Sequence, residues 1–295
     1  MEFSQFSISP ARYGLPTREQ IRVLRVWDGH YHGFITEDEA KHRQMMLFAD
    51  RMGIERSIAL DIGGPRKSPF SDTPFALRKV AIVEAEKNRL SGICRINPAD
   101  PEGSCRQMEK LIRNGPCIGI KYGGPVHNPE GILCSHPNND PIIRLAQELG
   151  AVVYIHTWMK VGGTPRLPGL GNDLAEPTPR DVVILARRFP NHPLICGHSG
   201  GDWELGVREI RAQKNVLLEF SGSDPHSGQV EYAIKELGPD RIVWGGHGPS
   251  RSYSTELGKV LDADLSKENQ MKVLGRNYRR MAADIFRRKG QKLEV

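Results

Sequence analysis

Two histidines, His30 and His32, stand at the end of an apolar stretch that reads Val26-Trp27-Asp28-Gly29-His30-Tyr31-His32. Side chains on a β-strand alternate between its two faces, so Asp28, His30 and His32 are predicted to point the same way. Two neighbouring imidazole groups on a rigid strand end are suited to binding one metal ion. A His-x-His pair also occurs by chance on surface strands, so this motif alone leaves both interpretations open.

Further strand-like segments end in residues of the same kind. Lys121 ends Cys117–Tyr122, and one histidine each follows three later apolar segments: His156, His198 and His247. A single strand-end histidine is most often a hydrogen-bonded structural residue. However, five of the chain's ten histidines lie at such strand ends. Chance placement of so many is improbable, so the pattern favours a metal site.

The elements that would position these residues alternate along the chain. The expected strands are Arg22–Asp28, Ser57–Ile62, Ser91–Ile96, Cys117–Tyr122, Ala151–His156, Pro193–His198, Val216–Phe220 and Arg241–Trp244. Helices are expected after Thr73, Asp140 and Thr178 and over Glu37–Met52, Ser104–Asn114, Asp202–Ala212, Gln229–Leu237, Thr255–Leu261 and Asn269–Arg288. Thr73, Asp140 and Thr178 each precede a proline, which places a capping residue before a proline at the first helical position.

Eight strand–helix units in series predict parallel strands with right-handed crossovers, and eight units close naturally into a (β/α)8 TIM barrel. A doubly wound open sheet is the alternative, but no glycine-rich phosphate loop follows the first strand. We expect an irregular arm over residues 1–20 and one barrel domain over residues 21–295. The Gly- and Pro-rich stretch Trp158–Glu176 follows a strand end and is expected to cover the barrel mouth.

Composition narrows the class of protein. Hydrophobic residues make up 38% and charged residues 26% of 295, which is ordinary for a soluble globular protein. The net charge is +6, and the positive residues cluster only near the C-terminus. Because no nucleic-acid-binding module accompanies this cluster, we interpret it as a solvated helix face and not as a nucleic-acid-binding surface. Five cysteines without a Cys-x-x-Cys motif, and no apolar segment of signal-peptide or membrane-spanning length, predict a cytoplasmic protein.

The order of the motifs resembles the amidohydrolase superfamily. His-x-His is followed by Gly119-Ile120-Lys121, then by His156, Gly197-His198 and an Arg-Ile-x-x-Gly motif at Arg241–Gly245. The chain is similar to the amidohydrolase-related branch, which contains decarboxylases of aminocarboxymuconate semialdehyde and hydroxybenzoates and also lactone hydrolases. The resemblance runs from Val26 to the terminal helix with Asn277-Tyr278-Arg279-Arg280.

This resemblance implies a barrel with one divalent metal ion, most often Zn²⁺. It implies metal ligands at His30, His32 and His156. His198 is implied as a further ligand or as a catalytic group that orients and polarises the substrate. Lys121 is implied to act in catalysis and to bind a substrate carboxylate or carbonyl.

The chain departs from the family at the eighth strand. The family motif ends in Gly-Ser-Asp or Gly-Thr-Asp, whereas this chain has Gly245-Gly246-His247. In the family, that aspartate touches the metal and takes a proton from the attacking water. We expect the side chain of His247 to enter the site in its place, since histidine can bind a metal or act as a base near neutral pH. An outward-turned His247 is the alternative.

Other polar residues are weaker candidates. Tyr122, beside Lys121, and Glu219, on the seventh strand, are predicted to bind substrate, and Glu219 is equally compatible with a structural role. Asp28 is placed to orient a ligand histidine. Three more candidates lie near strand ends or in loops: Asp61, Arg95 and Asp224.

Three functions remain open at this stage. The first is metal-dependent hydrolysis of a small carboxylate-bearing amide, ester or lactone. The second is non-oxidative decarboxylation on the same scaffold, and the third is a non-catalytic barrel that lost its eighth-strand aspartate. The expected partner is a small anionic organic substrate, with no nucleic acid and no membrane, and a homo-oligomer is left open.

Overall fold

The computed structural model describes most of the chain. The described residues are 16–34, 39–63, 73–124, 128, 130–159, 173, 175–222 and 227–295. None of the helices in these ranges is long and apolar enough to cross a membrane.

Eight parallel strands form one sheet in the order of the sequence. They are β1 (Val26–Tyr31), β2 (Ile54–Ile62), β3 (Leu90–Arg95), β4 (Cys117–Tyr122), β5 (Val152–Ile155), β6 (Leu194–Cys196), β7 (Val216–Glu219) and β8 (Ile242–Val243). The sheet curls until its two edges meet. The Gly29 amide donates to the Trp244 carbonyl at 3.1 Å, the His32 amide donates to the Gly248 carbonyl at 2.7 Å, and a parallel bridge joins Tyr31 to Gly248. The predicted (β/α)8 barrel is therefore confirmed.

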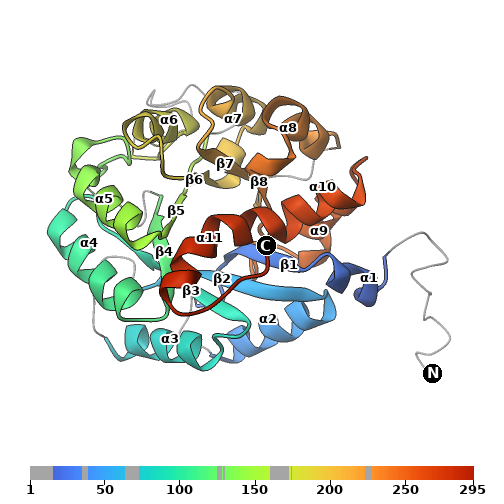
Figure 1. Cartoon of the computed structure of the whole chain (residues 1–295), viewed down its shortest axis with the longest axis horizontal. Coiled ribbons are helices and arrows are strands. Elements are labelled where there is room, and N and C mark those ends of the chain that lie inside the picture. Colours follow the sequence, from blue (N-terminus) through green and yellow to red (C-terminus); the bar gives the residue numbers. More distant parts are fainter. Residues whose placement is uncertain are drawn as a thin grey trace.

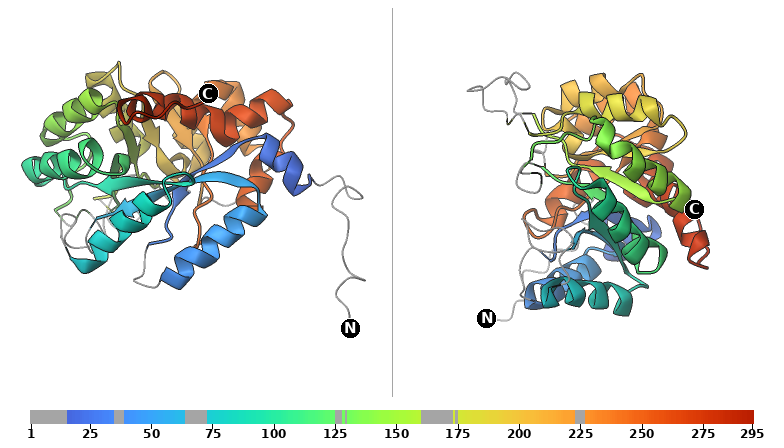
Figure 2. Two further views of the ribbon diagram at one scale, coloured as in Figure 1. Left: turned by 60° about the horizontal axis from the view of Figure 1, so that its bottom comes forward. Right: turned by 90° about the vertical axis from the view of Figure 1, so that its left-hand side faces the viewer.

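Helices surround this barrel (Figure 1). They are α1 (Arg18–Val23), α2 (Glu39–Arg51), α3 (Pro74–Ala85), α4 (Pro101–Met108), α5 (Asp140–Leu149), α6 (Pro179–Arg188), α7 (Trp203–Ile210), α8 (Gln229–Leu237), α9 (Tyr253–Leu261), α10 (Lys267–Met271) and α11 (Asn277–Arg288). The two side views show the same helices packed outside the strands (Figure 2). One hydrophobic core joins the strands to these helices.

The capping signals account for several helix boundaries. Thr73 caps α3 by accepting a hydrogen bond from the Ala76 amide, and Thr178 forms a capping box with Asp181 at α6. Gly150 ends α5 at φ 64°, a left-handed conformation that glycine adopts without steric cost.

The predicted start of the first strand is wrong. Arg22 lies in α1, and β1 begins only at Val26. A reciprocal capping box between Thr17 and Gln20 starts this short helix within the segment expected to be irregular. The predicted lid over 158–176 lies mostly outside the described residues.

The C-terminal helix α11 crosses the amino-terminal ends of the strands, in front of the barrel in Figure 1. Arg279 donates to the Arg25 carbonyl, just before β1, and Lys289 donates to the Gly115 carbonyl, just before β4. Asn277 is fully buried and donates to the carbonyls of Pro239 and Ile242 at 2.7 and 2.8 Å. This amide therefore ties α11 to the start of β8.

Replacing Asn277 should destabilise the barrel. Asn277→Ala leaves one buried and one part-buried carbonyl without this donor, so we expect the free energy of unfolding in urea to fall by about 2 kcal/mol. Asn88→Ala, at an exposed position, is the matched control and should change it by less than about 0.5 kcal/mol. Equal effects of the two substitutions would contradict the role of Asn277 as a tie between α11 and β8.

Candidate metal centre at the barrel mouth

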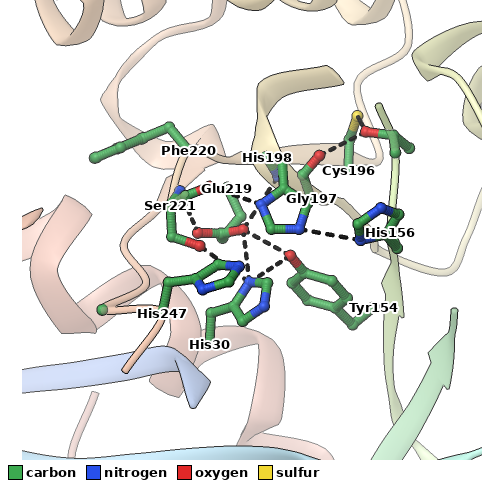
Figure 3. Close-up of polar contacts among 12 residues, drawn as sticks. His30, Tyr154, His156, Cys196, Gly197, His198, Glu219, Phe220, Ser221 and His247 are labelled. Carbon is green, nitrogen blue, oxygen red and sulfur yellow. Dashed lines mark hydrogen bonds and ion pairs between the residues drawn. The ribbon is translucent and has the colours of Figure 1, made fainter. Parts of the chain in front are cut away.

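The strand-end histidines gather at the carboxyl ends of the strands (Figure 3). His30 lies on β1, and its ring is fully buried at the centre of the group. The ring of His30 stacks on that of His247 with centroids 4.4 Å apart, and it lies 4.8 Å from that of His198. Its Nε2 atom lies 2.7 Å from Nε2 of His32. Three of the predicted site residues, His32, His198 and His247, therefore lie directly around His30.

The other nitrogen of His30 faces a buried polar network. Nδ1 lies 2.7 Å from the Tyr154 hydroxyl, 3.0 Å from Ser221 Oγ and 3.3 Å from Glu219 Oε2. A carboxylate only accepts hydrogen bonds, which favours a proton on Nδ1 of His30. The lone pair of this ring then lies on Nε2, toward His32, as metal ligation requires.

Glu219 connects this network to the neighbouring strands. Its Oε2 atom accepts hydrogen bonds from the Tyr154 hydroxyl at 2.7 Å and from the His198 amide at 3.2 Å, and Oε1 accepts from the Ser221 amide at 2.6 Å. The side chain is fully buried. Glu219 therefore supports the histidines, which is the structural alternative to its predicted substrate contact.

His198 occupies a tight turn after β6. Its backbone adopts φ 57°, in the left-handed region, and Ser199 follows at φ 52°. The ring Nδ1 lies 2.7 Å from the carbonyl of Ser221, which can only accept, so Nδ1 carries the proton. Nε2 is left with its lone pair and lies 3.1 Å from Nδ1 of His156.

His156 contacts His198 and a carboxyl group on the loop after β5. Its Nε2 atom lies 2.9 Å from Oε1 of Glu176. Burial raises the pKa of Glu176 to about 8, with a further contribution from the charge of Asp173. The structure therefore puts a carboxyl group beside the histidines that sequence reasoning did not single out.

The described residues contain two groups that could hold a metal ion, and within each group the ligand atoms all lie within 4.8 Å of one another. One contains His30, His32 and His247, and the other contains His30, His198 and Glu219. These nitrogen-rich donor sets suit a transition-metal ion such as zinc. The structure groups His247 with the His30–His32 pair, where the resemblance implied His156. The predicted ligand roles of His156 and His198 stay predictions.

His247 reaches this cluster from the segment after β8. Its amide donates to the His30 carbonyl at 2.7 Å, and its Nδ1 atom contacts Ser250 Oγ. The backbone adopts φ 49°, which is unusual for a residue with a Cβ atom. A Cβ atom on Gly222 would come within 2.8 Å of the His247 ring, so the absence of a side chain there leaves room for that ring.

Lys121 also faces the cluster. It is buried on β4, its Nζ atom lies 5.5 Å from the centre of the Tyr154 ring, and its charge contributes to lowering the pKa of His198. Arg95 of β3 is its register partner and is also buried. Tyr122 follows Lys121 directly on β4, so its side chain lies on the opposite face of the strand, where Cys134 and Arg188 affect its pKa. The structure does not bring Tyr122 to the histidines.

The remaining candidates lie apart from the ring nitrogens. Asp28 accepts hydrogen bonds from the amides of His30 and Gly246 at 2.9 and 2.6 Å, so it orients the backbone of a cluster histidine and not its ring. Burial raises the pKa of Asp28 to about 7. The side chain of Asp61 and all of Asp224 lie outside the described residues.

Two residues of the network were missed from the sequence, Tyr154 and Ser221. Both could have been found from the sequence. Tyr154 lies two residues before His156, and Ser221 lies two residues after Glu219, so each is expected on the same side of its strand as that candidate.

Burial keeps four of these imidazole rings neutral. Burial is the largest cause, and it lowers the pKa of His30 and His198 well below the usual value. Burial likewise lowers the pKa of His156 to about 3 and, with the charge of His198, lowers that of His247. Neutral rings with free lone pairs are the form that binds metal ions.

Comparisons with known proteins agree with the barrel fold. A family model described as Amidohydrolase matches residues 27–281. No curated protein matches this sequence.

Solved structures share the fold at low sequence identity. The 5-carboxyvanillate decarboxylase of Sphingomonas paucimobilis is 17% identical, with a TM-score of 0.63 over 88% of this chain and 98% of that one. The 2,6-dihydroxybenzoate decarboxylase of Rhizobium is 15% identical, with a TM-score of 0.65 over 87% and 97%. A 5-carboxyvanillate decarboxylase of Novosphingobium aromaticivorans, complexed with manganese and 4-hydroxy-3-methoxy-5-nitrobenzoic acid, is 20% identical, with a TM-score of 0.61 over 81% and 79%.

The lowered pKa of His156 predicts a pH-dependent stability. The ring takes up its proton near pH 6.5 in the unfolded chain and near pH 3 in the folded one. The unfolded state therefore binds more protons between these values, and the free energy of unfolding falls as the pH is lowered through them. In metal-free protein, His156→Gln should reduce this slope by at most about 1.4 kcal/mol per pH unit.

Urea unfolding in a chelating buffer at pH 7, 6 and 5 measures this slope. His136→Gln, at an exposed histidine, is the control and should leave the slope unchanged. Identical slopes for the parent protein and His156→Gln would show that the pKa of His156 is not lowered by folding.

The left-handed backbone of His247 predicts that glycine is more stabilising than alanine at this position, which is the reverse of their usual order in a helix. Glycine adopts φ 49° freely, whereas alanine pays a steric penalty, so we expect His247→Gly to be more stable than His247→Ala by about 1 kcal/mol. At exposed Glu209 in α7, the same pair of substitutions should show the usual helical order, with alanine more stable. Urea unfolding of the four variants tests this, and the same order at both positions would refute it.

Proposed function

This chain belongs to the amidohydrolase family, and we propose that it is a metal-dependent decarboxylase of a small hydroxyl-bearing aromatic carboxylate. The main support for this proposal is His247, the histidine that follows the eighth strand. The ring of His247 stacks on His30 where the family resemblance predicts an aspartate. The group formed by His30, His32 and His247 is therefore built from neutral donors.

A neutral donor set has a consequence for the substrate. The positive charge of a divalent ion stays uncompensated by such ligands and is matched best by an anion. Lys121 adds a further buried positive charge next to the cluster. A carboxylate with a neighbouring hydroxyl group supplies the oxygen ligands and the negative charge that this site lacks, and the relatives named for hydroxybenzoate substrates support this choice.

We assign one divalent metal ion to His30, His32 and His247, with His198 and His156 as neighbouring candidates. The nitrogen ligands favour zinc, while one structural relative was solved with manganese. When bound, such an ion would hold the substrate carboxylate and hydroxyl and withdraw electron density from them. Tyr154, Ser221 and Glu219 hold the ring of His30 in the orientation this needs.

Decarboxylation breaks the bond between the carboxylate and the aromatic carbon. The electron pair of that bond stays on the ring carbon, CO₂ leaves, and a proton takes its place. Glu176 borders the cluster and is the candidate to deliver this proton, because burial raises the pKa of its carboxyl group to about 8. Lys121 would orient the anionic substrate at the cluster.

Hydrolysis of a carboxylate-bearing amide, ester or lactone is the second candidate. It would use the neutral imidazole of His247 to accept a proton from water, but burial lowers the pKa of this ring and so makes it a weaker base. A barrel that binds ligands without catalysis is the third candidate. It requires no metal at all.

The proposal predicts CO₂ release from hydroxybenzoates by metal-loaded protein. The purified protein is first analysed for metal and then incubated with 2,6-dihydroxybenzoate, 5-carboxyvanillate and a set of lactones. We expect CO₂ from an aromatic acid, and in D₂O one deuterium at the carbon that carried the carboxylate. Lys121→Met should raise KM for the acid about tenfold or more while metal content stays unchanged.

The other outcomes identify the alternatives. Acid production from a lactone without CO₂ would establish the hydrolase instead. Protein that neither holds metal nor turns over any of these compounds would favour the non-catalytic barrel. An unchanged KM in Lys121→Met would remove that residue from substrate binding.

A further inference from the structure

A short segment after β7 supports three of the cluster histidines. In this segment, residues 220–222, the Ser221 carbonyl accepts from Nδ1 of His198 and the Ser221 hydroxyl lies 3.0 Å from Nδ1 of His30 (Figure 3). Gly222 fits against the rings of His198 and His247, where a Cβ atom would come within 3.1 and 2.8 Å of them. The position of this segment therefore sets the orientation of the rings.

The segment is held from behind by an ion pair on α9. Lys259 Nζ lies 2.9 Å from Glu256 Oε2 and donates to the Phe220 carbonyl at 3.3 Å. Burial raises the pKa of Glu256, and the Lys259 ammonium and the backbone amide of Gly222 oppose that shift. The Lys259 ammonium thus holds the start of the segment, and the Glu256 carboxylate holds that ammonium.

Among the ion pairs that lysine and arginine form in the described part of the chain, this pair is unusual because both side chains are buried. The side chains of Lys259 and Glu256 are 2% and 1% exposed. A buried ion pair gains little net stability, because the desolvation of both charges offsets their attraction. Where a buried ion pair is retained in a protein, its best-attested role is to fix one conformation of the groups around it.

We propose that the Glu256–Lys259 pair is a positioning element of the metal site, which acts on His30, His198 and His247 through residues 220–222. The inference rests on the proposed metal site and adds a support that lies behind its ligands. We do not assign either charged group a direct contact with a histidine ring. The pair instead fixes the backbone of residues 220–222, and this segment contacts the rings.

Metal affinity of the substrate-free protein tests the proposal. Glu256→Gln and Lys259→Met each leave one buried charge without its partner, and we expect each to weaken binding of Zn²⁺ or Mn²⁺ about 10- to 100-fold in competition with a chromophoric chelator. The double variant should recover part of this loss, because no unpaired charge remains. Lys259→Arg, which keeps the charge and a donor, should bind metal closer to the parent.

The matched control is the Glu84–Lys87 pair. It has the same three-residue spacing and a 3.0 Å contact, but both side chains are more than half exposed. Glu84→Gln and Lys87→Met should leave metal affinity unchanged. Ring ¹⁵N NMR of His198 provides a second readout, since loss of the Ser221 carbonyl contact should change its tautomer.

Folded Glu256→Gln and Lys259→Met variants with parental metal affinity and an unchanged His198 tautomer would overturn the proposal, even if their thermal stability were lower. Neither readout involves substrate, so absence of decarboxylation would refute the proposed function and leave this inference standing. A parent protein that binds neither Zn²⁺ nor Mn²⁺ would overturn this inference together with the assigned metal site.

Discussion

The buried carboxylate of Glu219 is the constraint on which the site depends. It accepts hydrogen bonds from Tyr154 on β5 and from the amides of His198 and Ser221, and it lies beside Nδ1 of His30 on β1. A carboxylate with no solvent contact is tolerated only if its oxygens are satisfied in this way. The closed barrel is what brings donors from β1, β5, β6 and β7 to one point. Fold and site are thus coupled through a single side chain.

The backbone at the barrel mouth carries strain that the hydrogen bonds of the site maintain. His198 and Ser199 lie in the left-handed region, as does His247. Such residues cost of order 1 kcal/mol each and persist where the surroundings over-determine them. Here the amide of His198 is held by Glu219, and the amide of His247 by the His30 carbonyl. The strain is therefore found where the rings must turn inward.

Much of this arrangement could be predicted from the sequence, because it follows from local rules. Apolar segments of strand length and proline-marked helix starts predict the barrel, and period-two alternation predicts that His30 and Lys121 face its interior. What could not be predicted depends on contacts between distant segments. Tyr154 meets His30 only because the barrel closes, and the pair on α9 supports Phe220 from another layer. The first strand was misplaced for a different reason, since the capping box at Thr17 adds a helix turn that apolar patterning does not reveal.

Histidine in place of the family aspartate also affects which reaction the site can sustain. Neutral ligands would leave a bound metal ion with its full charge, and Lys121 lies beside the cluster, so such a site would hold an anion strongly. A lactonase or amidase creates a new carboxylate in its product, which such a site would retain. A decarboxylase removes a carboxylate, so its product is less negative than its substrate and leaves more easily. The same electrostatic field would therefore favour substrate over product in decarboxylation and product over substrate in hydrolysis, and this asymmetry is why we propose decarboxylation ahead of hydrolysis.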